Sequence, residues 1–326
     1  MVTQRMLLCR AAGFLVQLAI VLCPAAHAAA YPSKPVRIIV PFAPGGGNDI
    51  IARYLAQQLT DTFGKPCLVE NKPGAGGALG IEAGVKSPPD GHTLVMISSS
   101  YSVNPSLYKL SFDPVTDITP LIQIAEGPQL VVANPAFPAK SVRELIAFAR
   151  QNPGLVSYAS SGPGTIIHVS AELFSAMAGI KMLHVPYKGT GPALADTLGG
   201  QTNLYFGSSA SSLPHVRSGR LRALAVTTLK RSPWLADVPT VDESGLPGFE
   251  VVLWYGLIAP KGLPRTVAQR INAEVGKLLL LERTAEQLHA DGLAPAGGTP
   301  EQFLERIKKD IDLWRGVITD AGIKVD

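Results

Sequence analysis

Hydrophobic residues near the start of the chain follow two different spacings. Ile38–Val40 is a short β-branched run, which predicts a buried strand. Ile51, Leu55 and Leu59 then recur every four positions, which predicts a helix. The loop between them, Ala43–Gly47, carries little side-chain bulk and leads to a helix start, where unpaired N–H groups and the positive dipole end attract anions. The stretch therefore predicts a strand, an anion-binding loop and a helix.

A glycine-rich loop has a simpler explanation, because tight turns often need glycine at positive φ. The same design occurs a second time, however. Ser160–Thr165 is a small-residue loop between a predicted strand, Leu155–Ala159, and a predicted helix, Thr165–Ala178. Two loops of this kind facing one cleft would be able to hold the two ends of one small anion.

The first half of the chain continues as alternating strands and helices. Cys67–Asn71 and Thr93–Ile97 are predicted strands, and Leu79–Val85 between them is a predicted helix. Parallel crossovers of this kind cover both faces of a sheet and leave ligand sites at the carboxyl ends of the strands. Ser99, in the polar run that ends the third strand, would then face the cleft, although a polar loop is the alternative.

The second half repeats this architecture. The predicted elements are extended segments at Leu121–Ile124 and Leu130–Val132, a helix at Val142–Arg150, strands at Leu155–Ala159, Met182–Val185, Leu204–Phe206 and Leu221–Thr227, and helices at Thr165–Ala178 and from Thr190. The chain then returns through an extended segment, Phe249–Ile258, to helices at Val267–Leu281 and Pro300–Ile318.

These patterns predict two lobes joined by two crossings. The chain enters the second lobe near Ile124 and leaves it near Val226. We therefore expect lobe 1 to comprise residues 31–124 and 226–326, and lobe 2 to comprise residues 125–225. Two crossings of this kind act as a hinge.

Residues 1–30 have the pattern of a secretory signal peptide. Arg5 and Arg10 precede an apolar run, Ala11–Leu22, and small residues with Ala-x-Ala spacing end the segment. The apolar run is shorter than the ~20 residues of a membrane span. Cys23 raises the question of lipidation, but Leu22 stands where a small residue is expected. We expect cleavage, export to the periplasm and no membrane insertion.

Composition narrows the possible functions. The chain has 326 residues, 46% of them hydrophobic, which suffices for two packed domains. Without the signal peptide the net charge is 27 basic minus 25 acidic residues, or +2. This small charge does not indicate a protein that binds nucleic acid. Cys67 is then the remaining cysteine, and its position in an apolar strand favours a buried thiol over a reactive one.

Enzyme signatures are missing from the sequence. It contains no Gly-x-Ser-x-Gly elbow, no phosphate loop, no His-Glu-x-x-His and no histidine pattern with metal-ligand spacing. We therefore predict no catalytic residue, no metal and no cofactor. His168 could approach a ligand from the first turn after the second glycine loop, or lie on the helix surface near Glu172. Tyr187 precedes Lys188, which either reaches the cleft mouth or is a solvated loop lysine.

Several motifs together resemble the periplasmic receptors of tripartite tricarboxylate transporters, the Bug family. The resemblance covers essentially the whole predicted mature chain. The motifs are Tyr31–Phe42, Gly45–Asp49, Val69–Gly77, Pro89–Leu94, His184–Gly189, Leu221–Thr227 and Asp237–Thr240.

The resemblance implies an α/β fold of the two-lobed periplasmic-binding-protein (Venus flytrap) type, in which each lobe is a mainly parallel sheet flanked by helices. In that family the loops at Phe42–Asp49 and Ser160–Thr165 supply backbone amides and ordered water to ligand carboxylates. This chain has Asn203 where the family usually has an acid, beside a small polar run, Gly207–Ser209, so the part that reads the ligand's distal group is expected to differ. The expected ligand-binding residues are Phe42, Ala43, Gly45, Gly46, Gly47, Asn48, Asp49, Ser99, Ser160, Ser161, Gly162, Gly164, Thr165, His168, Tyr187, Asn203 and Ser208.

The implied function is capture of a small organic carboxylate, whether a di- or tricarboxylate, an amino acid or an aromatic acid. A monomeric receptor would deliver it to the membrane permease subunits of a tripartite transporter. The alternative is a sensor that presents its closed form to a two-component signalling kinase.

Overall fold

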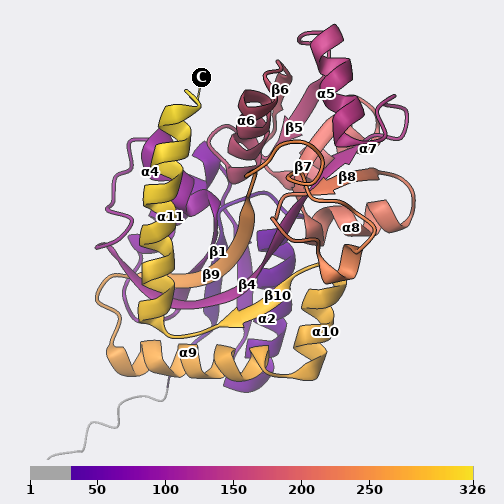
Figure 1. Ribbon diagram of the computed structural model, residues 1–326. Helices are drawn as coiled ribbons and strands as arrows, with labels where there is room; N and C mark the ends of the chain where they lie inside the picture. The colour runs from indigo at the N-terminus through magenta and orange to yellow at the C-terminus, as the bar shows by residue number, and fades with distance from the viewer. Residues whose placement is uncertain (1–30, 326) are drawn as a thin grey trace, which may run out of the picture. The chain divides into compact units, whose positions relative to one another are not determined.

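The structure is a computed structural model that describes residues 31–325 of the chain (Figure 1). The predicted signal peptide and lipidation question concern residues 1–30, which lie outside this range. The chain divides after Ser33 into two units. The description below concerns the unit that begins at Lys34.

Strands and helices alternate along this unit. The strands are β1 (Val36–Val40), β2 (Cys67–Asn71), β3 (Thr93–Ser98), β4 (Ile118–Ala133), β5 (Ser157–Ser160), β6 (Leu183–Pro186), β7 (Leu204–Ser208), β8 (Arg222–Val226), β9 (Val252–Pro260) and β10 (Ala294–Gly297). The helices are α2 (Gly47–Phe63), α3 (Ala78–Val85), α4 (Ser100–Leu107), α5 (Val142–Gln151), α6 (Ile166–Ala178), α7 (Thr190–Leu198), α8 (Ser209–Arg217), α9 (Arg265–Leu279), α10 (Glu282–Ala290) and α11 (Pro300–Asp320), with short 3-10 turns at Ala75–Gly77 and Pro233–Leu235.

The strands form two lobes that share β4. The sheet order is β2-β1-β3-β9-β4-β7-β5-β6, with β8 and β10 also paired to β4. In the first lobe β1 is parallel to β2 and β3, and in the second β5 is parallel to β6 and β7. Figure 1 shows α5, α6 and α7 around the second set of strands, and α9, α10 and α11 around the first. The structure is thus a two-lobed α/β fold with a parallel core in each lobe, as expected.

The two lobes meet where β4 changes its partners. Ile118–Pro128 pairs with β9, and Gln129–Ala133 pairs with β7. At this point Gln129 N donates to Thr227 Oγ1 (2.9 Å), Thr227 N donates to Gln129 O (3.1 Å), and Val251 N donates to Thr227 O (2.8 Å). Three passages of the chain are therefore tied together between the lobes. The predicted boundaries at 124/125 and 225/226 stay a prediction.

Most predicted elements are present, with local differences at their ends. The two extended segments predicted at Leu121–Ile124 and Leu130–Val132 are parts of one strand, β4, because the polar stretch between them continues the pairing with β9. Helix α2 begins at Gly47, four positions before its first predicted apolar residue. Four elements were not predicted: α4, α8, α10 and β10. Helices α4 and α8 start in serine runs and each contains a proline, so their sequences have weak helix signals.

Helix α11 covers the first lobe through a cluster of large buried side chains. Its Phe303 meets Trp254 of β9 edge to face, with ring centroids 5.5 Å apart. Trp254 Nε1 also donates to Asp310 Oδ2 (2.5 Å). Gly256, two residues along β9, leaves room for the Phe303 ring. The prediction that Pro300–Ile318 is a core helix is confirmed by the burial of its apolar face.

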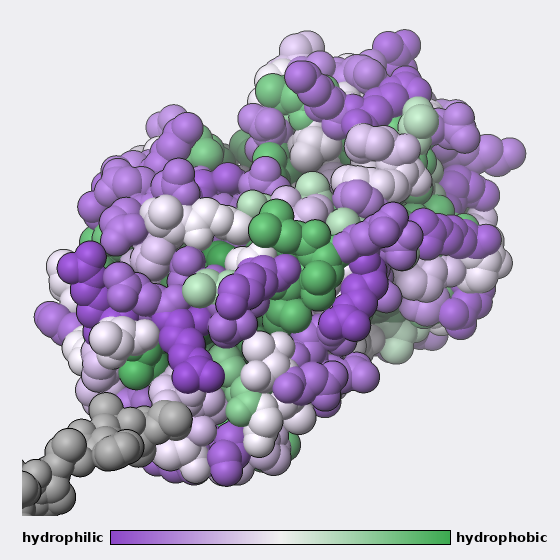
Figure 2. Space-filling view, turned by 90° about the horizontal axis from the view of Figure 1, so that it is seen from below, coloured by the Kyte–Doolittle hydropathy of each residue, from purple (hydrophilic) through white to green (hydrophobic). Residues whose placement is uncertain are grey.

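The outer surface of this lobe is mostly hydrophilic. Figure 2 shows, from below, a hydrophobic group near the centre of a largely polar face, with smaller hydrophobic spots around it. Leu280 and Leu281, between α9 and α10, are among the exposed leucines of the chain. Across residues 31–325, none of the helices combines the length and hydrophobicity that crossing a membrane requires.

Cys67 is a buried free thiol at the start of β2. Burial raises the pKa of Cys67 to about 11, so the thiol is protonated at neutral pH and is a poor nucleophile. This agrees with the structural role predicted for it.

Gly256→Ala tests the packing of α11 on β9. The added Cβ would lie 2.2 Å from Phe303 Cζ and 2.9 Å from the Ile122 carbonyl oxygen, so the sheet and helix must shift. We expect a loss of about 1–3 kcal/mol in the free energy of unfolding, measured by denaturant titration. Gly276→Ala in α9 is the matched control, because its nearest neighbour would be 4.0 Å away, and it should stabilise by about 0.5–1 kcal/mol. Equal effects of the two changes would contradict this packing.

Candidate ligand-binding site

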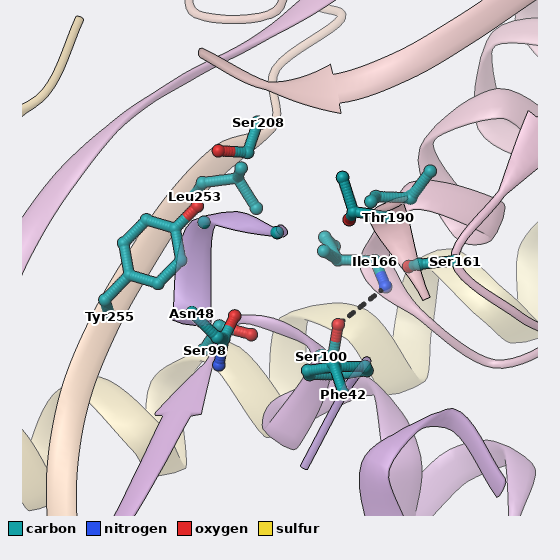
Figure 3. Close-up of a pocket in the computed structure, with 13 residues that line it drawn as sticks. Phe42, Asn48, Ser98, Ser100, Ser161, Ile166, Thr190, Ser208, Leu253 and Tyr255 are labelled. Carbon is teal, nitrogen blue, oxygen red and sulfur yellow. Dashed lines mark hydrogen bonds between the residues drawn. The ribbon is translucent and has the colours of Figure 1, made fainter. Parts of the chain in front are cut away.

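A small cavity lies where the two lobes face one another (Figure 3). Its volume is about 30 Å³, which is room for about two water molecules. The wall combines small polar groups with a few apolar side chains. The lining residues are Phe42, Gly46, Gly47, Asn48, Ser98, Ser100, Ser161, Ile166, Ile167, Thr190, Ser208, Leu253 and Tyr255.

Five helices of the described chain begin at this cavity. Helices α2, α4, α6, α7 and α8 follow the carboxyl ends of β1, β3, β5, β6 and β7, respectively. Each contributes a first or capping residue to the wall, namely Gly47, Ser100, Ile166, Thr190 and Ser208. None of the described lining residues is charged. The positive ends of five helix dipoles therefore point at a wall without a single cation.

Four of these five helix starts lack a side-chain cap. Among the five, a side-chain cap is present only on α6, where Thr165 Oγ1 accepts from His168 N. In α2, Asp49 N and Ile50 N both donate to Gly46 O, which leaves the amides of Gly47 and Asn48 without a partner among the described residues. Such amides can donate to an anion in the cavity.

Asp49 braces the first glycine loop from behind the wall. Its carboxylate accepts hydrogen bonds from Gly45 N (3.0 Å) and Asn71 Nδ2 (2.9 Å), and it pairs with Arg53. Asn71 Nδ2 also donates to Phe42 O (3.0 Å). Burial alone would raise the pKa of Asp49, but the bonds from Arg53, Gly45 and Asn71 hold it below its usual value. Asp49 is thus an ionised positioning group for the loop, and its charge is neutralised by Arg53.

Polar contacts hold the two lobes together beside the cavity. Ile166 N donates to Ser100 Oγ (3.1 Å), as Figure 3 shows. Asn104 Nδ2 donates to Gly164 O (3.1 Å), and the Tyr108 hydroxyl donates to Pro163 O (2.7 Å). On the other side, a Cβ on Gly191 would lie only 2.6 Å from Pro44 O. The two lobes are therefore held in a closed arrangement, in which residues at the end of α4 donate hydrogen bonds to the second glycine loop.

The structure brings six of the residues predicted for the site to the cavity wall. These are Phe42, Gly46, Gly47, Asn48, Ser161 and Ser208. Others shape the loops without reaching the wall. These are Ala43, Gly45 and Asp49 in the first loop, and Ser160, Gly162, Gly164 and Thr165 in the second. Ser99 is occupied in the sheet, where its Oγ accepts from Trp254 N (2.9 Å).

Asn203, predicted near the ligand's distal group, is not at the wall. Its Oδ1 accepts hydrogen bonds from Ser157 N (2.9 Å) and Ser157 Oγ (3.1 Å), so it fixes the start of β7. Ser208 stands at the other end of β7, about 16 Å along a strand that advances ~3.3 Å per residue. Tyr187 also lies outside the wall, where its hydroxyl donates to Asp196 Oδ2 (2.5 Å).

Several lining residues were not among those predicted. Thr190 was recognised as a helix start, and Ser98 and Ser100 belong to the polar run around Ser99, so these had a sequence signal. Tyr255 and Leu253 come from a long apolar strand that gives no indication of facing a ligand. The remaining additions are Ile166 and Ile167 at the start of α6.

His168 faces a second cavity behind the glycine loop. Its ring stacks on that of His184 with centroids 4.3 Å apart, and its Nδ1 accepts from Gly164 N (3.3 Å). His184 Nε2 lies 2.6 Å from Ser160 Oγ. This second cavity, of about 570 Å³, is also lined by Glu172 and Lys324. Both histidines therefore support the second loop from outside the first cavity.

Burial of these rings keeps them neutral. It lowers the pKa of both His168 and His184 to about 4, and for His168 the neighbouring His184 adds to the effect. In the described part of the chain, no group of three or more His, Cys, Asp or Glu side chains is arranged to hold a metal ion. The groups that the site offers a ligand are hydrogen-bonding groups and helix dipoles.

The two lobes, the cavity between them and the helix starts that line it define a solute-binding fold of the two-lobed periplasmic-binding-protein type. Residues 51–323 match the profile of TctC, the tripartite tricarboxylate transporter family receptor. The chain belongs to this family.

Solved structures support the same assignment. The periplasmic binding protein BugD is 34% identical, with a TM-score of 0.88, covering 91% of this chain and 100% of its own. An R. palustris protein with adipate gives the same identity, TM-score and coverage. MatC from Rhodopseudomonas palustris with bound malate is 31% identical, with a TM-score of 0.85, covering 88% of this chain and 100% of its own.

The stacked histidines predict a pH dependence of stability. With folded pKa values of about 4 against an ordinary 6.5, the folded protein binds fewer protons than the unfolded chain between these pH values. The contribution of these neutral histidines to the free energy of unfolding is therefore fully present above about pH 6.5. It falls as the pH is lowered towards 4, by up to about 1.4 kcal/mol per pH unit for each histidine.

His168→Asn tests this directly, because it removes the titrating ring and keeps an acceptor for Gly164 N. We expect Tm to fall less steeply in the variant than in the wild type between pH 7 and 4.5, measured by calorimetry. Parallel Tm curves for the two proteins would show that His168 does not titrate in this window.

Proposed function

We propose that this protein is an exported periplasmic receptor that captures a small organic carboxylate and delivers it to the permease subunits of a tripartite transporter. The observation that carries the proposal is the convergence of five helix starts on one uncharged cavity between two lobes. A ligand that suits such a wall is an anion small enough to be enclosed. The proposed role is binding and release, with no chemical step.

Backbone amides can supply the affinity. A hydrogen bond from an N–H group to a carboxylate contributes about 1.5–3 kcal/mol, and a helix dipole adds roughly 0.3–1 kcal/mol. About four or five such bonds, less the cost of immobilising a small ligand, suffice for a micromolar Kd, or about −8 kcal/mol. A buried lysine or arginine would have brought its own desolvation penalty. Backbone amides are uncharged, so a wall made of them does not contain a buried charge that destabilises the ligand-free protein.

Known ligands of related proteins favour this chemistry. The adipate and malate of the two R. palustris structures are both small dicarboxylates. In this chain, the parts predicted to bind a carboxylate are the glycine loops that begin α2 and precede α6. The predicted signal peptide and the family's place beside a membrane transporter support export and a permease partner.

Binding of a carboxylate requires the lobes to open. A dicarboxylate is larger than this cavity of about 30 Å³, so we expect the contacts of Ser100, Asn104 and Tyr108 across the cleft to break when one enters. We expect the two lobes to turn about the hydrogen-bonded group of Gln129, Thr227 and Val251, because β4 exchanges its partners there. We propose lobes close to 31–124 with 226–326, and 125–225, moving as rigid bodies.

Isothermal titration against a panel of small carboxylates tests the function. We expect at least one panel member to bind the wild type with a Kd in the micromolar range or tighter. Gly46→Val should abolish that binding, because its Cβ would already be 3.0 Å from Thr190 and its methyl groups would cover the first amides of α2. Lys188→Ala should weaken binding by less than about threefold, since Lys188 is exposed and outside the wall.

Thermal melting of both variants without ligand controls for folding. Loss of binding in Lys188→Ala together with full binding in Gly46→Val would rule out the amide mechanism. Failure of the whole panel to bind the wild type would reject the proposed function itself.

A further inference from the structure

Two side chains of the first lobe hold the second glycine loop without lining the cavity. Tyr108, the C-cap of α4, donates a hydrogen bond from its hydroxyl to Pro163 O (2.7 Å). Asn104, one turn earlier, donates from Nδ2 to Gly164 O (3.1 Å) and to Gly76 O (3.2 Å). Neither donor is among the residues that line the cavity. Two successive carbonyls of a loop in the second lobe are therefore held by side chains from the first.

The hydrogen bond from Tyr108 also fixes how the loop presents its backbone. In a planar trans peptide the oxygen and the N–H group point to opposite sides. The oxygen of the Pro163–Gly164 peptide accepts from Tyr108, and the nitrogen on the opposite side donates to His168 Nδ1 (3.3 Å). Rotation of this peptide would break both bonds. The orientation of the loop therefore depends on the first lobe as well as on α6.

The lobes approach each other closely enough here to require glycine on both sides. A Cβ on Gly164 in the second lobe would lie 2.4 Å from Tyr108 Cε2. A Cβ on Gly76 in the first lobe would lie 2.9 Å from Pro163 O. The ring of Tyr108 thus packs directly on the loop, and Tyr108→Phe removes its hydrogen bond while keeping this packing.

The same contact contains a group that favours opening. Asn104 is 2% exposed, and its Oδ1 has no hydrogen-bond partner among residues 31–325. A buried acceptor without a partner is unfavourable, and opening of the lobes would let water pair with it. The gain from the two donor bonds of Asn104 is therefore partly offset. This balance keeps the closed arrangement reversible, as a receptor that releases its ligand requires.

Hydrogen bonds that form only on closure act on release more than on capture. A ligand enters the open protein, in which the bond between Tyr108 and Pro163 has not formed, so this bond does not affect entry. The bond must break before the ligand leaves the closed protein. One hydrogen bond between neutral groups changes such an equilibrium by about three- to tenfold. Differences of this kind fall mainly on the dissociation rate constant.

We propose that Asn104 and Tyr108 are positioning residues that hold the second glycine loop in its binding orientation and set the rate at which a bound ligand leaves. Both act through the loop, and neither has to touch the ligand. Their effect on a ligand rests on the proposed function, whereas their effect on the loop does not.

Hydrogen exchange in the ligand-free protein tests the effect on the loop. Ile166 N donates to Ser100 Oγ across the cleft (3.1 Å; Figure 3), so this bond protects the amide proton only while the lobes are closed. We expect Tyr108→Phe to speed exchange of this proton by about three- to tenfold, measured by NMR. Tyr101→Phe is the matched control, because Tyr101 of the same helix donates to Pro114 O, also at 2.7 Å, within the first lobe. It should leave this exchange rate unchanged.

Stopped-flow kinetics test the effect on release, with adipate and malate, the ligands of two related proteins, as probes. For a probe that binds the wild type, we expect Tyr108→Phe to raise the dissociation rate constant by about three- to tenfold and to leave the association rate constant within about twofold. Asn104→Leu, which removes two donor bonds, should raise the dissociation rate constant at least as much. Tyr101→Phe should match the wild type in both rate constants.

Two results would overturn the proposal. One is an equal exchange rate of the Ile166 amide in the two tyrosine variants. The other is a change confined to the association rate constant. If no small carboxylate binds the wild type, the proposed function fails instead, and the exchange of Ile166 still decides whether Tyr108 holds the loop.

Discussion

The convergence of five helix starts on one uncharged cavity is the arrangement on which the proposed capture of an anion depends. Strands β1, β3, β5, β6 and β7 are each followed by a helix whose start contributes a residue to the cavity wall. Glycine is required at position 47, because a Cβ there would collide with Tyr255 and Ser208. At position 46 a Cβ would lie 3.0 Å from Thr190. Asp49 matters because it holds the loop in place from behind while its charge is balanced by Arg53. The path of the backbone, and not a charged side chain, thus shapes this part of the wall.

A second constraint is that this cavity exists only when two lobes meet. Strand β4 runs through both lobes, and its change of partners beside Gln129 and Thr227 provides one fixed point between them. Helix α4 supplies Ser100 and Asn104, and its C-cap is Tyr108; the hydrogen bonds of these three residues join the first lobe to the second glycine loop and the start of α6. Because Ser100 Oγ accepts from the first amide of α6, closure and the binding surface share the same helix start. A ligand that neutralises these amides would favour the closed arrangement.

Sequence patterns predicted the elements whose apolar spacing is regular, such as the helix through Ile51, Leu55 and Leu59. The two glycine loops and Thr190 were visible because small residues before a helix have a local physical meaning. Tyr255 was not visible, because a tyrosine in an apolar strand has the same local pattern whether it faces a core or a cavity. Helices α4 and α8 were missed because Pro105, Pro214 and the serine runs weaken their helix signals. Asn203 seemed close to Ser208 in sequence, but a strand separates its two ends in space.

Amide proton chemical shifts report directly whether these helix starts bind an anion. In a two-dimensional NMR titration of 15N-labelled protein with a carboxylate that binds, we expect large downfield shifts for the amide protons of Gly47 and of the first residues of α7 and α8. Such shifts report hydrogen bonds from these N–H groups to the anion. Unshifted amides at these helix starts at saturation, with loss of binding on replacement of a lysine or arginine, would rule out binding by backbone amides.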